Sequence, residues 1–169
     1  MRKVYGVLTW LMLLWSVLLS ILGLFFLLAA LSNVQALLPL FVVVATLLYI
    51  LFSFEFYQKG LRFNLPFKPE RKDWIKVNAF VALAWSLLLI GQAVYFWVQP
   101  EVINEFLGQF ENIMKEMGNP EGGKQVNLRR IVNYSIGFTA AIGCIKLAHV
   151  IMTLIFIKKR PDLFMRQPT

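Results

Sequence analysis

Several residue types are scarce in this chain of 169 residues, and each scarcity excludes a class of protein. The single cysteine excludes an internal disulfide framework and a zinc site built from several cysteines. The single histidine excludes bis-histidine haem and metal sites built from a histidine cluster. Charged residues make up only 15% of the chain, against about 25% in soluble domains, so an ordinary soluble domain is excluded.

Apolar side chains fill the composition instead. They account for 59% of the residues, which is too much apolar surface for a disordered chain. A helix needs about 20 apolar residues to cross a bilayer. Four runs reach that length, at about residues 4–31, 36–57, 74–98 and 131–157. We therefore predict an all-α integral membrane protein, a single domain over residues 1–169 in which four transmembrane helices form an antiparallel bundle.

The distribution of basic residues predicts how the spans are oriented. The first apolar run is nearly twice as long as the apolar core of a secretory signal, so we expect a retained signal-anchor helix after Arg2 and Lys3. Lysine and arginine concentrate in the loop 58–73 and after the fourth run, whereas the loop after the third run is rich in glutamate. Because basic loops stay on the cytoplasmic side, we expect both termini in the cytoplasm, in a plasma membrane or a bacterial inner membrane.

The loop between the third and fourth runs has a helical pattern of its own. Apolar residues recur at helical spacing over about 101–117, and Pro100 and Glu101 suit the first turn of a helix. Gly118, Asn119 and Pro120 are expected to end it before a flexible return over 121–124. We predict an amphipathic external helix that docks on lipid or on protein.

The fourth run carries two contrasting faces. Its small residues form a seam that would let another helix approach closely: Gly137, Ala140, Ala141, Cys144 and Ala148. Its polar residues cluster on the opposite side: Ser135, Thr139, Lys146, His149 and Thr153. This favours a membrane-protein partner or a homo-oligomer through the fourth span. The alternative is a seam packed within the monomer and a polar stripe that faces an internal crevice.

Lys146 is the most informative residue, because it lies roughly 16 Å inside the inner boundary of the membrane. A charge at that depth costs at least about 2.5–3.5 kcal/mol on insertion scales. The candidates for a ligand site or an ion pair at this level are Lys146, His149, Glu55, Trp85, Tyr49 and Asn78. A structural pair of Glu55 with Lys146 or His149, a cation–π contact with Trp85, an acid in a partner subunit, and an anion, lipid-headgroup or proton site all remain open.

No pattern for catalysis, a cofactor or a metal ion is present in the sequence, and no nucleic-acid-binding motif. Six basic residues are candidates for contact with anionic lipids: Lys59, Arg62, Lys68, Arg71, Lys72 and Lys76. We expect a non-enzymatic polytopic protein that is an accessory or assembly subunit of a larger membrane complex. The alternative is a small transporter, channel or lipid-binding protein that uses Lys146 and His149.

Overall fold

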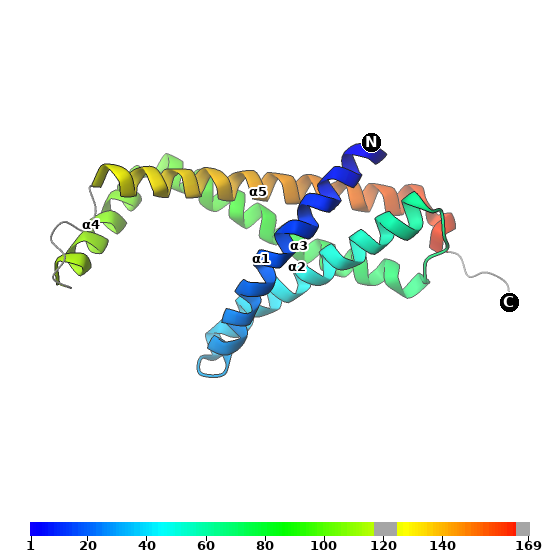
Figure 1. The fold of residues 1–169 in the computed structure, drawn as a ribbon, viewed down its shortest axis with the longest axis horizontal. Coiled ribbons are helices and arrows are strands. Elements are labelled where there is room, and N and C mark those ends of the chain that lie inside the picture. Colours follow the sequence, from blue (N-terminus) through cyan, green and yellow to red (C-terminus); the bar gives the residue numbers. More distant parts are fainter. Residues whose placement is uncertain (117–124, 165–169) are drawn as a thin grey trace. The chain divides into compact units, whose positions relative to one another are not determined.

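The computed structural model describes residues 1–116 and 125–164, and within them every regular element is helical (Figure 1). The turns η1 and η3 are 3₁₀-helices and η2 is a π-helix. In chain order the elements are α1 (Arg2–Ala30), η1 (Val34–Ala36), α2 (Leu37–Glu55), η2 (Phe56–Arg62), α3 (Pro69–Val98), α4 (Pro100–Glu116), α5 (Gln125–Lys159) and η3 (Pro161–Phe164).

Four helical segments of the described chain are long and apolar enough to cross a membrane, which confirms the four predicted spans. They cover Arg2–Ala30, Val34–Arg62, Pro69–Val98 and Leu128–Lys159. The second segment joins η1, α2 and η2 into one continuous helical stretch, so it extends five residues beyond the predicted end at Tyr57.

The basic loop predicted over 58–73 is consequently helical at both of its ends. Its first residues belong to η2, where the amide of Phe63 bonds the carbonyl of Gln58 at 3.2 Å. Its last residues begin α3, with Pro69 in the first turn and Glu70 beside it, as the helix dipole favours. Asn64 closes η2 in the left-handed conformation (φ 55°), which asparagine tolerates better than most residues.

The chain divides into two compact units. Unit 1 comprises Met1–Trp85 and Ile145–Thr169, and unit 2 comprises Ser86–Cys144. The helices α3 and α5 each contribute to both units, which are described separately below. The organisation into a single domain stays a prediction.

In unit 1, α1 and α2 form a hairpin. Asn33 begins the short turn between them, and its side chain accepts a hydrogen bond from the amide of Gln35 at 2.9 Å. Trp10 packs edge-on against Phe54, with ring centroids 5.1 Å apart. Gly6, one turn earlier in α1, lies against the hydroxyl end of the Tyr57 side chain. Residues early in α1 therefore meet residues late in the α2–η2 stretch, so the two helices are antiparallel.

The core of unit 1 is an apolar cluster with residues from all four spans, from η2 and η3, and from the connection between η2 and α3. Val150 and Ile157 of α5 pack there with residues of α1, α2 and α3, and no side chain of this cluster is more than 7% exposed. Its members are Tyr5, Met12, Leu19, Tyr49, Ile50, Phe56, Leu61, Phe67, Ile75, Ala79, Ala82, Val150, Ile157, Leu163 and Phe164.

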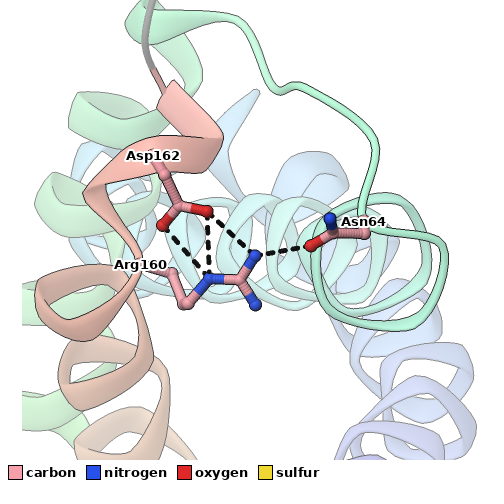
Figure 2. Close-up of polar contacts among 3 residues, drawn as sticks. All are labelled: Asn64, Arg160 and Asp162. Atoms are coloured by element: carbon pink, nitrogen blue, oxygen red, sulfur yellow. Dashed lines mark hydrogen bonds and ion pairs between the residues drawn. The ribbon is translucent and has the colours of Figure 1, made fainter.

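At one end of unit 1, η3 is fastened to the segment that follows η2. The guanidinium of Arg160 donates to both carboxylate oxygens of Asp162 and, at 2.5 Å, to the side-chain oxygen of Asn64 (Figure 2). The amide of Phe67 donates to the carbonyl of Leu163 at 2.6 Å. Arg160, which directly follows α5, and Leu163 of η3 are thus bonded to the connection between η2 and α3.

This fastening should depend on pH. The hydrogen bond from Arg160 lowers the pKa of Asp162, so its stabilising effect is present above the pKa of a free aspartate, about 3.9, and is lost as the pH falls further. We expect acidification below about pH 4 to reduce the hydrogen-exchange protection of the Phe67 amide several-fold. Asp162→Asn should show the reduced protection already at neutral pH, while Asp73→Asn should not. Equal protection in wild type and Asp162→Asn at neutral pH would contradict this role.

Unit 2 combines α4 with parts of α3 and α5. Ile103 and Leu107 of α4 are buried in a second apolar cluster with Ala93, Ile136 and Ala140. A helix therefore stands where one was predicted over about 101–117, and its external, amphipathic placement stays a prediction. The predicted stop and return over 117–124, with Glu121 and Lys124, lie outside the described residues, as does Arg166.

Gly143 lies at a close contact of α5 with α3 within unit 2. A Cβ atom at this position would lie 2.9 Å from Cγ1 of Ile90 and 3.3 Å from the carbonyl oxygen of Ser86. Gly137, nearly two turns earlier in α5, has no such neighbour within 4 Å. Of these two glycines, Gly143 is the one whose missing side chain the packing requires.

Candidate functional site

Lys146 lies inside unit 1. Its side chain extends from α5 and the residue is only 2% exposed. Its ammonium donates to Oγ1 of Thr46, on α2, at 3.4 Å. Among the described residues it takes part in no ion pair. The predicted intramembrane lysine is therefore held within its own chain and does not face outward to a neighbour.

His149 follows one turn later on α5 and is completely buried. Its Nε2 lies 3.0 Å from Oγ1 of Thr9, on α1, and its Nδ1 lies 2.7 Å from the hydroxyl of Tyr49, on α2. The ring of Tyr5 stacks on the imidazole, with centroids 5.0 Å apart and planes inclined by 7°. Three helices thus meet at this ring.

Thr153, one further turn along α5, is a second meeting point. Its Oγ1 lies 3.0 Å from the Tyr5 hydroxyl and 2.9 Å from the Tyr49 hydroxyl. Tyr5, Thr9, Tyr49, His149 and Thr153 are all 0% exposed, and we call them the His149 network. Within the described chain, every buried side-chain nitrogen or oxygen has at least one hydrogen-bond partner.

The spacing of these residues explains their local geometry. Tyr5 and Thr9 are four residues apart on α1, as are His149 and Thr153 on α5. Each threonine donates its hydroxyl to the backbone carbonyl one turn earlier, at 2.7 Å from Thr9 to Tyr5 and at 2.8 Å from Thr153 to His149. This is the usual bond of a threonine inside a helix. Because each threonine hydrogen is used in this bond, each threonine oxygen can only accept a hydrogen bond from another helix.

The same contacts give the directions of the helices. Lys146 meets Thr46, and His149 meets Tyr49, so the order of residues is the same on α5 and α2. On α1 the order is reversed, because His149 meets Thr9 whereas Thr153 meets Tyr5. In unit 1, α5 is therefore parallel to α2 and antiparallel to α1.

The other site candidates from the sequence lie elsewhere. Glu55 pairs with Lys59 at 2.7 Å and approaches Arg71 at 3.8 Å, so the described residues do not form the expected pair of Glu55 with Lys146 or His149. Asn78 is buried, but its amide donates to the backbone carbonyl of its own helix at Trp74. Trp85 is half-buried, and the described cation–π contacts do not join it to Lys146.

Of the six candidates, the structure joins His149 to Tyr49, and Lys146 lies one helical turn before His149 on α5, bonded to Thr46. The residue that sequence reasoning missed is Tyr5, which both stacks on the imidazole and bonds Thr153. The available signal was its position one helical turn before Thr9, on the same face of a mostly apolar helix.

The small-residue seam of α5 is divided between buried and exposed positions. Ala140 is buried in the cluster of unit 2, and Gly137 is half-buried. Ala141, Cys144 and Ala148 are exposed. We call these three residues the exposed seam.

The polar stripe on the other side of α5 is buried only in unit 1. In unit 2, Ser135 and Thr139 line a half-open cleft of about 200 Å³ together with Gln92 and four apolar residues. The hydroxyl of Thr139 donates to the carbonyl of Ser135, within its own helix.

The six basic candidates for lipid contact differ in how they are engaged. Lys59 and Arg71 share Glu55, and the Lys72 ammonium lies 5.6 Å from the centre of the Phe164 ring. Arg62 donates to the side chain of Gln58 at 3.3 Å and lies over the ring of Phe63. Lys68 is exposed and Lys76 is half-buried.

Within the part of the chain that the structure describes, no three histidine, cysteine, aspartate or glutamate side chains are grouped so that they could hold a metal ion. No protein-family model, no curated protein and no solved structure matches this chain.

Proposed function

We propose that this chain is a non-enzymatic polytopic membrane protein that serves as an accessory or assembly subunit of a larger membrane complex. The observation that carries the proposal is the division of α5 into two faces. Lys146, His149 and Thr153 are buried within the chain's own helices, whereas the exposed seam is left uncovered.

The exposed seam has the form of a docking site for a transmembrane helix. At 100° per residue, Ile145 and Ile151 flank it on either side, and both side chains are exposed. Small residues between larger ones form a shallow groove along the helix. Because lipid tails are as apolar as the helix surface, association in a membrane depends on such close backbone packing. The partner we propose is a transmembrane helix, from another membrane protein or from a second copy of this chain.

We further propose that the four spans form an antiparallel bundle with both termini in the cytoplasm and with α4 outside. Supporting this, the side chain of Arg2 donates to the carbonyl of Arg62 at 3.0 Å, and Arg160 bonds Asn64. The beginning of α1 and the end of α5 are thus tied to the same basic connection. Basic connections of this kind remain on the cytoplasmic side, where Lys68 can contact anionic lipid headgroups.

The alternative, a small transporter or channel, would need an aqueous route to Lys146 and His149. These residues are 2% and 0% exposed, and their buried polar atoms have hydrogen-bond partners on the chain's own helices. This buried geometry supports a role in holding three helices together. It favours the subunit over the transporter.

Enlarging the exposed seam should prevent association. We expect Ala148→Leu and Ala141→Leu each to reduce the complexed fraction at least about tenfold, because a larger side chain separates the two helix backbones. Native mass spectrometry after extraction in a gentle detergent measures this fraction. Ala84→Leu, at an exposed alanine of α3, is the matched control. A wild-type chain that is entirely monomeric and without a partner, or an equal loss in Ala84→Leu, would contradict the proposal.

A further inference from the structure

The hydrogens of the His149 network can be assigned from its geometry. Thr9 and Thr153 each donate to a backbone carbonyl, which has no hydrogen to give. With these two donations in place, the contact between Thr9 and His149 uses a hydrogen on Nε2; the other assignment, in which Thr9 donates to Nε2, would place the ring hydrogen on Nδ1. The contact between Tyr5 and Thr153 then uses the Tyr5 hydroxyl hydrogen.

One hydrogen is then missing from the network when the imidazole is neutral. Six donor–acceptor pairs join these five residues. Four hydroxyls and a neutral ring provide only five hydrogens. The shortage falls on the Tyr49 hydroxyl, which lies within hydrogen-bond distance of both His149 Nδ1 and Thr153. It can donate its single hydrogen to only one of them. The nearby Ser53 hydroxyl does not resolve this, because it donates to the carbonyl of Ile50.

We propose that the His149 network is a proton-binding site, whose ligand is a single hydrogen ion held at Nδ1 of His149. When the proton binds, Nδ1 changes from acceptor to donor and bonds the Tyr49 oxygen. The Tyr49 hydroxyl then turns its hydrogen to Thr153, and all six pairs have a hydrogen. The site gains one hydrogen and one positive charge, and no covalent bond between heavy atoms forms or breaks.

The charges around the ring set the conditions for binding. Burial opposes the added charge, because removing an ion from water costs several kcal/mol. Two titratable side chains contact the imidazole, Tyr5 from α1 and Tyr49 from α2. A third, Tyr57 from η2, contacts the Tyr5 ring. The buried polar residue that α3 contributes in unit 1 is the neutral Asn78.

Lys146 is the one basic residue that shares this interior with His149 among the described residues, and no buried acid is present there. A positive charge on Lys146, one helical turn away, opposes a second positive charge on the ring. The two groups therefore compete, and the network binds its proton most readily when Lys146 is neutral.

Because the chain has only one histidine, its ring can be observed without assignment. We would label the full-length protein with ring-¹⁵N histidine, place it in lipid nanodiscs, and record the nitrogen shifts from about pH 9 down to the pH at which the helices unfold. At alkaline pH we expect a hydrogen on Nε2 and none on Nδ1. On acidification we expect Nδ1 to gain a proton while circular dichroism shows an unchanged fold.

Three variants separate proton binding from a merely structural role. Thr153→Val keeps the side-chain shape but removes the acceptor that Tyr49 needs in the protonated state, so the ratio of doubly to singly protonated ring at a given pH should fall about tenfold. Lys146→Met should raise this ratio about tenfold or more. Thr139→Val, whose hydroxyl bonds only within its own helix in unit 2, should leave it unchanged.

The wild-type measurement decides the proposal even if Thr153→Val does not fold. A neutral ring with its hydrogen on Nδ1 would overturn it. So would a ring that stays singly protonated down to the pH at which the helices unfold, or a ratio that is the same in Thr153→Val and Thr139→Val.

Discussion

Tyr49→Ala is expected to lower the free energy of unfolding by about 3–5 kcal/mol, the range for deleting a buried aromatic ring. Tyr49 is completely buried, and its hydroxyl bonds both His149 and Thr153. The substitution therefore leaves a cavity between α2 and α5 and removes a partner from each of two buried polar groups. Reversible unfolding in mixed lipid–detergent micelles, followed by circular dichroism, measures the change.

Two further variants divide this effect into its parts. Tyr49→Phe keeps the ring and removes only the hydroxyl, so it should cost about 1–2 kcal/mol. Tyr134→Ala removes a ring that is 71% exposed and should change the free energy of unfolding by no more than about 0.5 kcal/mol. If Tyr49→Ala were no more destabilising than Tyr134→Ala, α2 and α5 would not pack through this network.

Gly143→Leu should destabilise the chain by about 2–3 kcal/mol, because overpacking a close helix contact forces backbones apart. A Cβ atom there already approaches the carbonyl oxygen of Ser86, which belongs to the backbone of α3 and cannot rotate away. Gly137→Leu is the matched control, since it makes the same chemical change on the same helix where nothing lies within 4 Å.

The difference between the two glycine variants is the informative quantity. Both variants gain the same helix propensity when leucine replaces glycine, at most about 0.8–1.0 kcal/mol, and this gain cancels in the comparison. Thermal unfolding in the same detergent gives the two free energies. Equal stability of Gly143→Leu and Gly137→Leu would show that the close approach of α5 to α3 is absent in solution.

The spans were predictable because continuous apolar runs of more than 20 residues have few alternatives to a membrane helix. The residues at which the spans end were harder to predict. The second span continues beyond Tyr57 as a π-helix, and this continuation follows from local bonds such as that from Phe63 to Gln58. Hydropathy does not record such bonds, because they involve the backbone and not the side chains.

The sequence predicted how deep in the membrane the candidate site residues lie, but not how the helices are aligned with one another. Counting residues along the spans correctly brought Tyr49 to the level of His149. It allowed Glu55 to reach Lys146, but the parallel alignment of α2 and α5 sets Thr46 beside Lys146 instead. Glu55 is then displaced by nine residues, about 13 Å along the helix, and pairs with the nearer Lys59. The relative rotation and shift of two helices depend on packing, which one sequence does not display.

The long sequence separation between α5 and its partners on α1 and α2 has a consequence for how the protein is made. Tyr49 and its partner His149 are 100 residues apart in the chain, and Tyr5 and Thr153 are 148 apart. During synthesis the hairpin of α1 and α2 is therefore completed well before α5 leaves the ribosome. Its tyrosine and threonine hydroxyls then have no interhelical partner in the bilayer, where such groups are costly. Membrane insertion of α5 is accordingly the step that completes the interior of unit 1, and until that step the first two spans depend on water, lipid headgroups or the insertion machinery for their polar contacts.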